Sequence, residues 1–82
     1  MIDIVEPGYY RHFKGNLYRV LMTAKHTETE ESMVIYQAMY GHRQIWCRPY
    51  SDFVAKVDKT KYPNSSQTYR FEKIERMTEL CE

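Results

Sequence analysis

The sequence has few of the features that identify a specialised environment. Its 82 residues include two cysteines, three glycines and three prolines. No apolar run approaches the roughly 20 residues that span a bilayer. The wide separation of Cys47 and Cys81 favours free thiols in a reducing compartment over a disulfide. Residues 1–7 lack the basic and apolar regions of a signal peptide, so we expect a cytoplasmic protein that does not associate with membranes.

An excess of charge of either sign is also absent. The chain has 12 basic and 11 acidic residues, which gives a formal net charge of +1. Broad nucleic-acid surfaces usually show a basic excess, so this balance weighs against one while leaving room for a local basic site. The length suits one domain with one core. We expect a lead-in over residues 1–7, the folded unit over 8–76 and a tail over 77–82.

The stretch from Ser32 to Pro49 has the strongest pattern in the chain. Its first half is rich in β-branched and aromatic residues, which predicts a strand. Gly41 suits a two-residue turn that needs a positive φ, and Pro49 ends the second strand because it has no N–H for a ladder. Both faces of the strand formed by residues 33–40 are mostly apolar, which predicts a central strand that is covered on both sides.

Alternating patterns elsewhere predict further strands at 9–13, 17–24 and 68–74. In the second of these, Tyr18, Val20 and Met22 are expected on one face. Ser51 is expected to cap a short helical segment over 52–57. Five short strands with one helical turn before the last predict an all-β fold, a small five-stranded SH3-like barrel, in which closure removes exposed edges.

A polar segment at 25–31 precedes the central hairpin. It is compatible with an irregular loop, or with one helical turn in which Thr27 and Glu30 form a capping box. His26, Glu28 and Glu30 are metal-ligand types, but one loop with a single histidine is a weak signal and we predict no metal. A loop that a rigid sheet positions often carries function, so its hydroxyl and carboxylate groups are candidates for ligand contact.

Several short pieces of the sequence resemble one family in the same order along the chain. They are Tyr10-Arg11-His12-Phe13-Lys14-Gly15, Tyr18 with Val20, Ala24-Lys25-His26-Thr27-Glu28-Thr29, Val34-Ile35-Tyr36-Gln37 with Tyr40-Gly41, Trp46 with Arg48-Pro49, and Phe53 with Val57. The family is the bacterial and phage "domain of unknown function" family 1653. The resemblance covers about residues 8–57 and implies an SH3-like barrel with no established activity.

The central strands offer a second set of candidates. Trp46 and Arg48 share one strand face, and together provide a flat stacking surface and a planar fork for phosphate. The alternative is that Trp46 fills the core and Arg48 pairs with a carboxylate. Tyr36 and Tyr40 leave the same choice between core and stacking. Gln37 interrupts an apolar strand, so it points to solvent or makes a specific hydrogen bond.

No catalytic group is evident. A nucleophile needs an adjacent base and an orienting group, and no sequence motif of this kind is present. We therefore expect a protein that is not an enzyme and that needs no cofactor. Arg11, His12 and Lys14 form a small basic cluster on the first hairpin, although Arg11 and His12 point to opposite strand faces.

The preferred function is capture of a nucleotide-like small molecule without catalysis. A barrel this small is filled by its own side chains, so the ligand should lie at or near subunit interfaces of a homo-oligomer. By analogy, small phage proteins sequester host immune signalling nucleotides in this way. The alternatives are a nucleic-acid-binding module and a protein–peptide interaction module. The candidate ligand-binding residues are Arg11, His26, Thr27, Glu28, Thr29, Tyr36, Gln37, Trp46 and Arg48.

Overall fold

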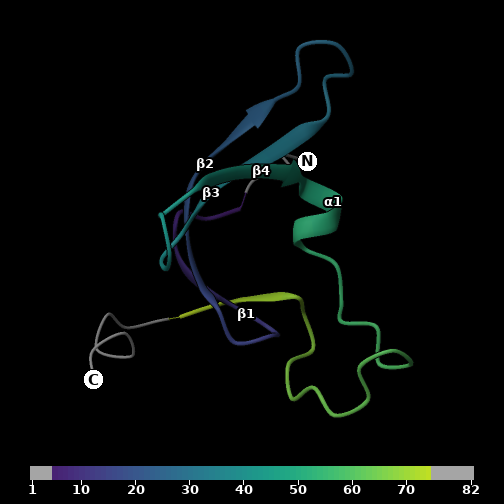
Figure 1. Cartoon of the computed structure of the whole chain (residues 1–82). Helices are drawn as coiled ribbons and strands as arrows, with labels where there is room; N and C mark the ends of the chain where they lie inside the picture. Colours follow the sequence, from purple (N-terminus) through teal and green to yellow (C-terminus); the bar gives the residue numbers. More distant parts are fainter. Residues whose placement is uncertain (1–4, 75–82) are drawn as a thin grey trace.

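Five antiparallel strands form one sheet in the computed structural model of the chain, which describes residues 5–74 (Figure 1). The strand order is β4-β3-β2-β1-β5. The elements are β1 (Gly8–His12), β2 (Leu17–Lys25), β3 (Ser32–Ala38), β4 (Ile45–Pro49), α1 (Tyr50–Phe53) and β5 (Phe71–Lys73). The expected all-β class, the five strands and the short helix before the last strand are confirmed. The expected tail over 77–82 lies outside the described residues.

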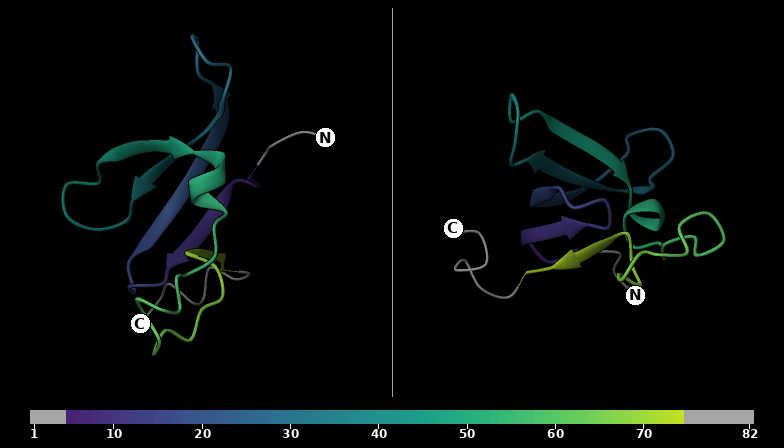
Figure 2. Two further views of the ribbon diagram at one scale, coloured as in Figure 1. Left: turned by 90° about the vertical axis from the view of Figure 1, so that its right-hand side faces the viewer. Right: turned by 60° about the horizontal axis from the view of Figure 1, so that its bottom comes forward.

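The sheet is curved but open, so a closed barrel is not observed among residues 5–74 (Figures 1 and 2). β4 and β5 are its two edges, and they do not pair with each other. The final strand is shorter than expected, since β5 has only three residues in place of 68–74. Residues 54–70 run as a loop, and the single bridge Lys56–Tyr69 draws its two ends together.

One face of the sheet carries the core. β3 alternates between buried and half-buried residues, which confirms the predicted period of two. Its outer face is only partly covered, so the expected double covering is wrong. The centre of the core is a parallel stack of Phe53 from α1 on Phe71 from β5, with ring centroids 4.1 Å apart and planes inclined by 8°. The cluster comprises Val5, Tyr10, Val20, Val34, Tyr36, Phe53 and Phe71.

A β-bulge in β2 changes the faces that simple alternation predicts. The register with β3 shifts between Val20 and Met22, so one residue of β2 is unpaired. Val20 is buried, whereas 55% of the Met22 surface is exposed. The assignment of Met22 to the same face as Val20 is therefore wrong, because an extra residue reverses the alternation beyond the bulge.

Two local predictions around the central hairpin need correction. The link between β3 and β4 spans residues 39–44 rather than two residues, and both Gly41 and Arg43 have positive φ. Pro49 ends β4 as expected. Ser51 does not cap α1, because the helix already begins at Tyr50 and its N-cap is Pro49, without a side-chain hydrogen bond.

The segment between β2 and β3 is a single turn, closed by a hydrogen bond from the Glu30 N–H to the His26 carbonyl oxygen (2.9 Å). His26 accepts hydrogen bonds at Nδ1 from the backbone N–H groups of Glu28 (3.1 Å) and Thr29 (3.4 Å). Glu30 has a positive φ of 61°, so a right-handed helical conformation does not continue through this residue. The capping-box alternative with Thr27 is wrong, since the Glu30 N–H donates to the His26 carbonyl oxygen (2.9 Å) and not to the Thr27 hydroxyl.

The stack at the core centre gives a stability prediction. Phe53→Leu removes the ring that packs on Phe71 at a site that is only 2% exposed. We expect the free energy of unfolding in urea to fall by about 1–3 kcal/mol. Met22→Leu, on the exposed face of β2, should change it by less than about 0.5 kcal/mol. Equal effects of the two substitutions would contradict this description of the core.

Candidate functional site

Two surface pockets share one lining residue, Arg48, and together they are here called the groove. The first, here called the aromatic pocket, has a volume of about 260 Å³ and is lined by Tyr18, Tyr36, Tyr40, Trp46 and Arg48. The second, here called the cationic pocket, has a volume of about 300 Å³ and is lined by His12, Phe13, Lys14, Arg48, Asp58, Lys61, Tyr62 and Arg70. Arg48 lines both pockets, so the guanidinium group joins them.

The aromatic pocket combines fixed and exposed rings. Tyr36 is buried and accepts a hydrogen bond at its hydroxyl from Arg48 Nε (3.1 Å). Trp46 is the neighbour of Tyr36 across the β3–β4 ladder, yet 52% of its surface is exposed. Tyr40 is 46% exposed. The pocket therefore has one buried aromatic wall, Tyr36, and a rim of exposed aromatic surface from Trp46 and Tyr40. This arrangement suits stacking of a flat ligand.

A pair of tyrosine hydroxyls closes one side of the aromatic pocket. The Tyr18 and Tyr40 hydroxyl oxygens lie 2.8 Å apart and share a hydrogen bond. Burial, followed by the hydrogen bond with Tyr40, raises the pKa of Tyr18 to about 12. This hydroxyl consequently stays protonated at neutral pH, so it contributes a dipole and not a charge.

Three aromatic rings that line the cationic pocket, those of His12, Phe13 and Tyr62, form a row that continues to Phe71 in the core. The ring centroids of His12 and Phe71 are 4.8 Å apart, those of His12 and Phe13 4.6 Å, and those of Phe13 and Tyr62 4.9 Å. Because Phe71 belongs to the core, this row ties the pocket to the sheet. The row connects β1 with the loop at 54–70, and these two segments are far apart in the sequence.

Cations lie along this row of rings. The Nζ atoms of Lys14 and Lys61 are 5.4 and 5.7 Å from the centroid of the same ring, that of Tyr62. At the other end, the Arg48 Cζ is 5.5 Å from the Phe71 centroid. Contacts of this length are in the range of cation–π interactions. Each contact favours a position of the cation beside its ring, and the ammonium N–H groups of the two lysines stay available as donors.

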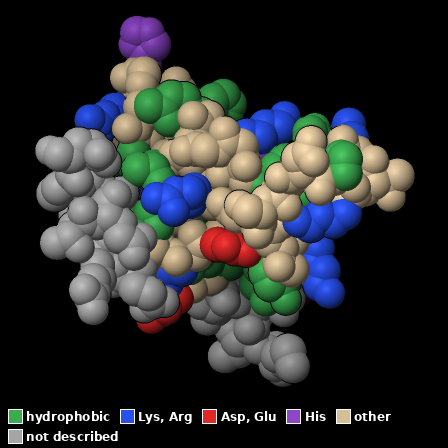
Figure 3. Space-filling model, turned by 90° about the horizontal axis from the view of Figure 1, so that it is seen from below, with side chains coloured by type: hydrophobic (Ala, Val, Ile, Leu, Met, Phe, Trp, Pro, Cys, Tyr) green, Lys and Arg blue, Asp and Glu red, His purple; other side chains and the backbone are tan. Residues whose placement is uncertain are grey.

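The cationic pocket has little internal compensation of charge. Within residues 5–74 the salt bridge is between Lys73 and Glu6, and it does not involve a pocket cation. Asp58 is the acid of the pocket, and its Oδ1 accepts hydrogen bonds from the backbone N–H groups of Thr60 (3.0 Å) and Lys61 (3.3 Å). Lys and Arg side chains are scattered over the face seen from below, and acidic side chains are sparse there (Figure 3).

His12 responds to this environment. Burial, followed by the positive charges of Arg48, Lys14 and Arg70, lowers the pKa of His12 below its ordinary value of 6.5. Its Nδ1 accepts a hydrogen bond from the backbone N–H of Lys14 (3.2 Å). The lowered pKa favours the neutral form of the imidazole, and the cations Arg48, Lys14 and Arg70 line the same pocket as His12.

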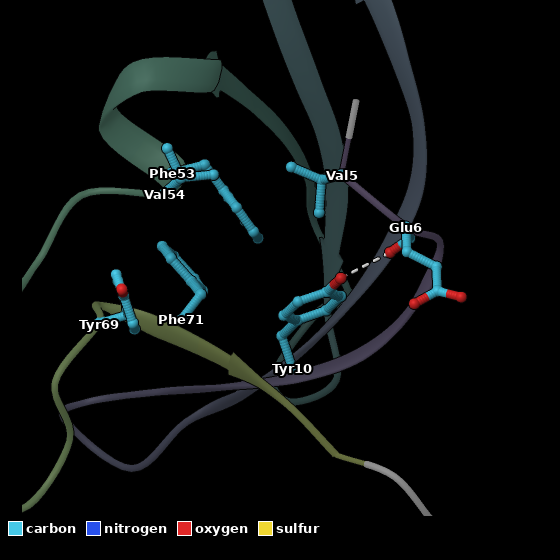
Figure 4. A pocket seen from close by; sticks show the side chains of 7 residues that line it. All are labelled: Val5, Glu6, Tyr10, Phe53, Val54, Tyr69 and Phe71. Carbon is cyan, nitrogen blue, oxygen red and sulfur yellow. Dashed lines mark hydrogen bonds between the residues drawn. The ribbon is translucent and has the colours of Figure 1, made fainter. Parts of the chain in front are cut away.

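A further pocket of about 330 Å³ lies on the other side of Phe71 and is mainly apolar (Figure 4). Tyr10 donates a hydrogen bond from its hydroxyl to the Glu6 carbonyl oxygen (2.7 Å), and the rings of Phe53 and Phe71 face the space. The lining residues are Val5, Glu6, Tyr10, Phe53, Val54, Tyr69 and Phe71. Most of them belong to the core, and the lead-in at residues 1–7 contributes Val5.

The structure brings together three of the predicted sheet residues. Tyr36, Trp46 and Arg48 line the aromatic pocket, with Tyr36 as core and Trp46 as accessible surface. Gln37 lies on the opposite face of β3 and donates from Nε2 to the Arg43 carbonyl oxygen (3.0 Å), so its amide ties down the 39–44 link. Arg11 is exposed and lines neither pocket of the groove.

The predicted loop residues lie apart from the groove. His26, Thr27, Glu28 and Thr29 are at the far tip of the β2–β3 hairpin (Figure 1) and line neither the aromatic nor the cationic pocket. In residues 5–74, no three His, Cys, Asp or Glu side chains gather in a way that could hold a metal ion. A ligand role for this loop stays a prediction.

Sequence reasoning missed most of the cationic pocket. Lys14 and His12 were recognisable as a basic cluster. Lys61 and Tyr62 lie in the hydrophilic stretch between the expected helical segment and the last strand, and Arg70 was expected within the strand at 68–74. Hydrogen bonds shape that loop: Lys59 Nζ donates to the carbonyl oxygens of Ser65 (2.6 Å) and Gln67 (2.8 Å). No local pattern indicates that these bonds place the loop beside His12.

Two other features bear on the sequence-based expectations. Cys47 is exposed and is a free thiol, whereas Cys81 lies outside the described residues. None of the helical structure in the part of the chain that is described is long and apolar enough to cross a membrane.

The fold and the groove define a small all-β domain with an open five-stranded sheet and an aromatic and cationic surface groove. The chain belongs to the family described as "Protein of unknown function (DUF1653)", which matches residues 8–73. This confirms the resemblance found in the sequence. The chain is similar to a DUF1653 protein from Bordetella bronchiseptica in its crystal structure, with a TM-score of 0.71 and 29% identity over 85% of this chain and 87% of that one. No curated protein matches the chain.

The lowered pKa of His12 predicts a pH dependence of stability. The unfolded chain binds a proton at His12 near pH 6.5, whereas the folded chain binds it only at a lower pH. The stability that this residue contributes is therefore fully present above pH 6.5 and is lost as the pH falls through the folded pKa. His12→Asn retains a side-chain acceptor for the Lys14 N–H but cannot titrate. Urea unfolding should show a steeper acid loss of stability in the native protein than in His12→Asn, and equal slopes would contradict the assignment.

Proposed function

We propose that this protein binds a nucleotide-like small molecule in the groove and captures it without chemical conversion. The observation that carries the proposal is the half-exposed Trp46 indole at a pocket that also presents the Arg48 guanidinium. An aromatic ring offers a base a stacking surface, and a guanidinium offers a phosphate a planar pair of donors. Their shared pocket supports a ligand that has both a flat ring and an anionic group.

The proposed location is the cytoplasm, where free nucleotides are available as ligands and where a free thiol such as Cys47 persists. The proposed role is sequestration, of the kind in which a small phage or bacterial protein lowers the concentration of a signalling nucleotide. Sequestration requires affinity for the ligand and no catalytic group, so the experiments that test it measure binding alone.

Trp46 is the single tryptophan of the chain, which provides a direct optical test. Stacking of a base on the indole should quench its fluorescence in titrations with mono-, di- and cyclic nucleotides. Loss of a stacking partner costs about 1–3 kcal/mol, so calorimetry on Trp46→Ala should show affinity weakened by about 5- to 150-fold. Trp46→Phe should retain most of the affinity.

Ile45→Ala is the matched control for Trp46→Ala. Ile45 is the preceding residue of β4, is 53% exposed, and points to the other face of the strand. Its removal should leave nucleotide affinity unchanged. The proposed site would be refuted if the native protein bound none of the nucleotides tested, or if the two variants lost the same amount of affinity.

We further propose that a second copy of the chain completes the site. The aromatic pocket of about 260 Å³ is slightly smaller than the range of about 300–1,000 Å³ typical of ligand pockets, and it lies at β4, an edge of the sheet. A partner chain at this edge would cover the exposed rings. Native mass spectrometry should detect an oligomer that retains nucleotide, and a monomer in both free and nucleotide-bound samples would contradict this part of the proposal.

A nucleic-acid-binding function is the second candidate, and the lining of the cationic pocket, with four cations and one acid, favours it. Such binding loses affinity steeply as the salt concentration rises, because bound phosphates release counterions. A slope of this kind, with a single-stranded oligonucleotide preferred over mononucleotides, would assign the groove to nucleic acid.

A further inference from the structure

The cationic pocket is built from three separate parts of the chain. His12 and Lys14 come from the end of β1 and the turn after it, Arg48 comes from β4, and Lys61 and Arg70 come from the loop at 54–70. A lone lysine on a surface is unremarkable, but here the fold brings four cations to one cavity of about 300 Å³. A cost is attached to this arrangement, since like charges that share a site repel one another.

The charges of the pocket are not compensated by its own acid. Four cationic side chains and the single carboxylate of Asp58 line the pocket, which gives the lining a net formal charge of +3. None of the four cations makes a salt bridge within residues 5–74. The Asp58 carboxylate is also engaged with the backbone N–H groups of Thr60 and Lys61. An anion is therefore the ligand class that this pocket stabilises.

We propose that the cationic pocket binds the phosphates of a nucleoside diphosphate or longer oligophosphate whose base occupies the aromatic pocket. This inference rests on the proposed function, which it deepens by naming the substrate class. A phosphate monoester carries a charge of about −1.5 to −2 at pH 7, so three uncompensated positive charges match a ligand with more than one phosphate. The shared residue Arg48 sits between the base and the phosphate ends.

The geometry of the donors agrees with a chain of phosphates rather than one. Lys14 and Lys61 lie at the Tyr62 ring, whereas Arg48 lies at the Phe71 ring. Three successive ring contacts separate these two rings, through His12 and Phe13. One phosphate near Arg48 and another near the two lysines would use both ends of the pocket.

Inorganic pyrophosphate is the probe that isolates this pocket, because it has no base to stack. Calorimetry at low ionic strength should show that it binds the native protein more tightly than inorganic phosphate does. The side chains of Lys61 and Arg70 make no hydrogen bonds to other described residues. Lys61→Gln and Arg70→Gln should each lower the affinity for pyrophosphate by about tenfold, which corresponds to the loss of one charge-assisted contact.

Lys25→Gln is the control of equal charge loss. Lys25 ends β2, and the register places β1 against the opposite end of that strand, so it lies roughly 25 Å from the turn that carries Lys14. It should leave pyrophosphate affinity unchanged. Equal weakening in the Lys25 and Lys61 variants would overturn the proposal, because it would indicate diffuse attraction and not a site. Absence of pyrophosphate binding would overturn it as well.

Parallel titrations with adenosine and ADP separate this inference from the proposed function. If pyrophosphate binds but neither adenosine nor ADP quenches Trp46, the phosphate pocket stands and the stacking site fails. If adenosine quenches Trp46 but pyrophosphate does not bind, the stacking site stands and the phosphate pocket fails. A short single-stranded oligonucleotide that binds more tightly than ADP would overturn the assignment to a free nucleotide in favour of a nucleic-acid backbone.

Discussion

The stack of Phe53 on Phe71 is the contact on which the rest of the structure depends. β5 has three residues and pairs with β1 alone, so its backbone hydrogen bonds contribute little to keeping it in the sheet. The Phe71 ring keeps it there, since it packs on Phe53 and also contacts Tyr18, Tyr36 and His12. Once β5 is fixed, the end of the 54–70 loop is fixed too, and Arg70 accepts a hydrogen bond at its carbonyl oxygen from the Phe13 N–H (2.8 Å).

The groove follows from this anchoring. Tyr36 belongs to the core and also lines the aromatic pocket, and Phe71 of the core contacts His12 and Arg48 of the cationic pocket, so core residues help to set the positions of groove residues. Arg48 illustrates the connection: its guanidinium lies near Phe71 and donates to the Tyr36 hydroxyl, and both rings belong to the core cluster. These contacts favour one position of the Arg48 guanidinium before any ligand arrives, which reduces the entropy that binding must overcome.

Sequence patterns predicted what local periodicity controls. The five strands, the short helix and the alternation of β3 are of this kind, and so is the pairing of Trp46 with Arg48 on one strand face. The patterns failed where one residue changes the phase, as at the bulge beside Met22, and where backbone bonds set a turn, as at Gly41. They also failed for Lys61 and Arg70, whose positions depend on a ring stack between α1 and β5 that no local pattern records.

The central claim is that the aromatic and cationic pockets act as one site for one ligand. A titration of the isotopically labelled protein with ADP, followed by two-dimensional proton–nitrogen NMR, tests this most directly. The account predicts that the Trp46 indole and the backbone amides of Lys14, Lys61 and Arg70 shift together along one binding curve, while those of His26 to Thr29 stay unchanged. Shifts confined to one pocket, or two curves with different affinities, would contradict it.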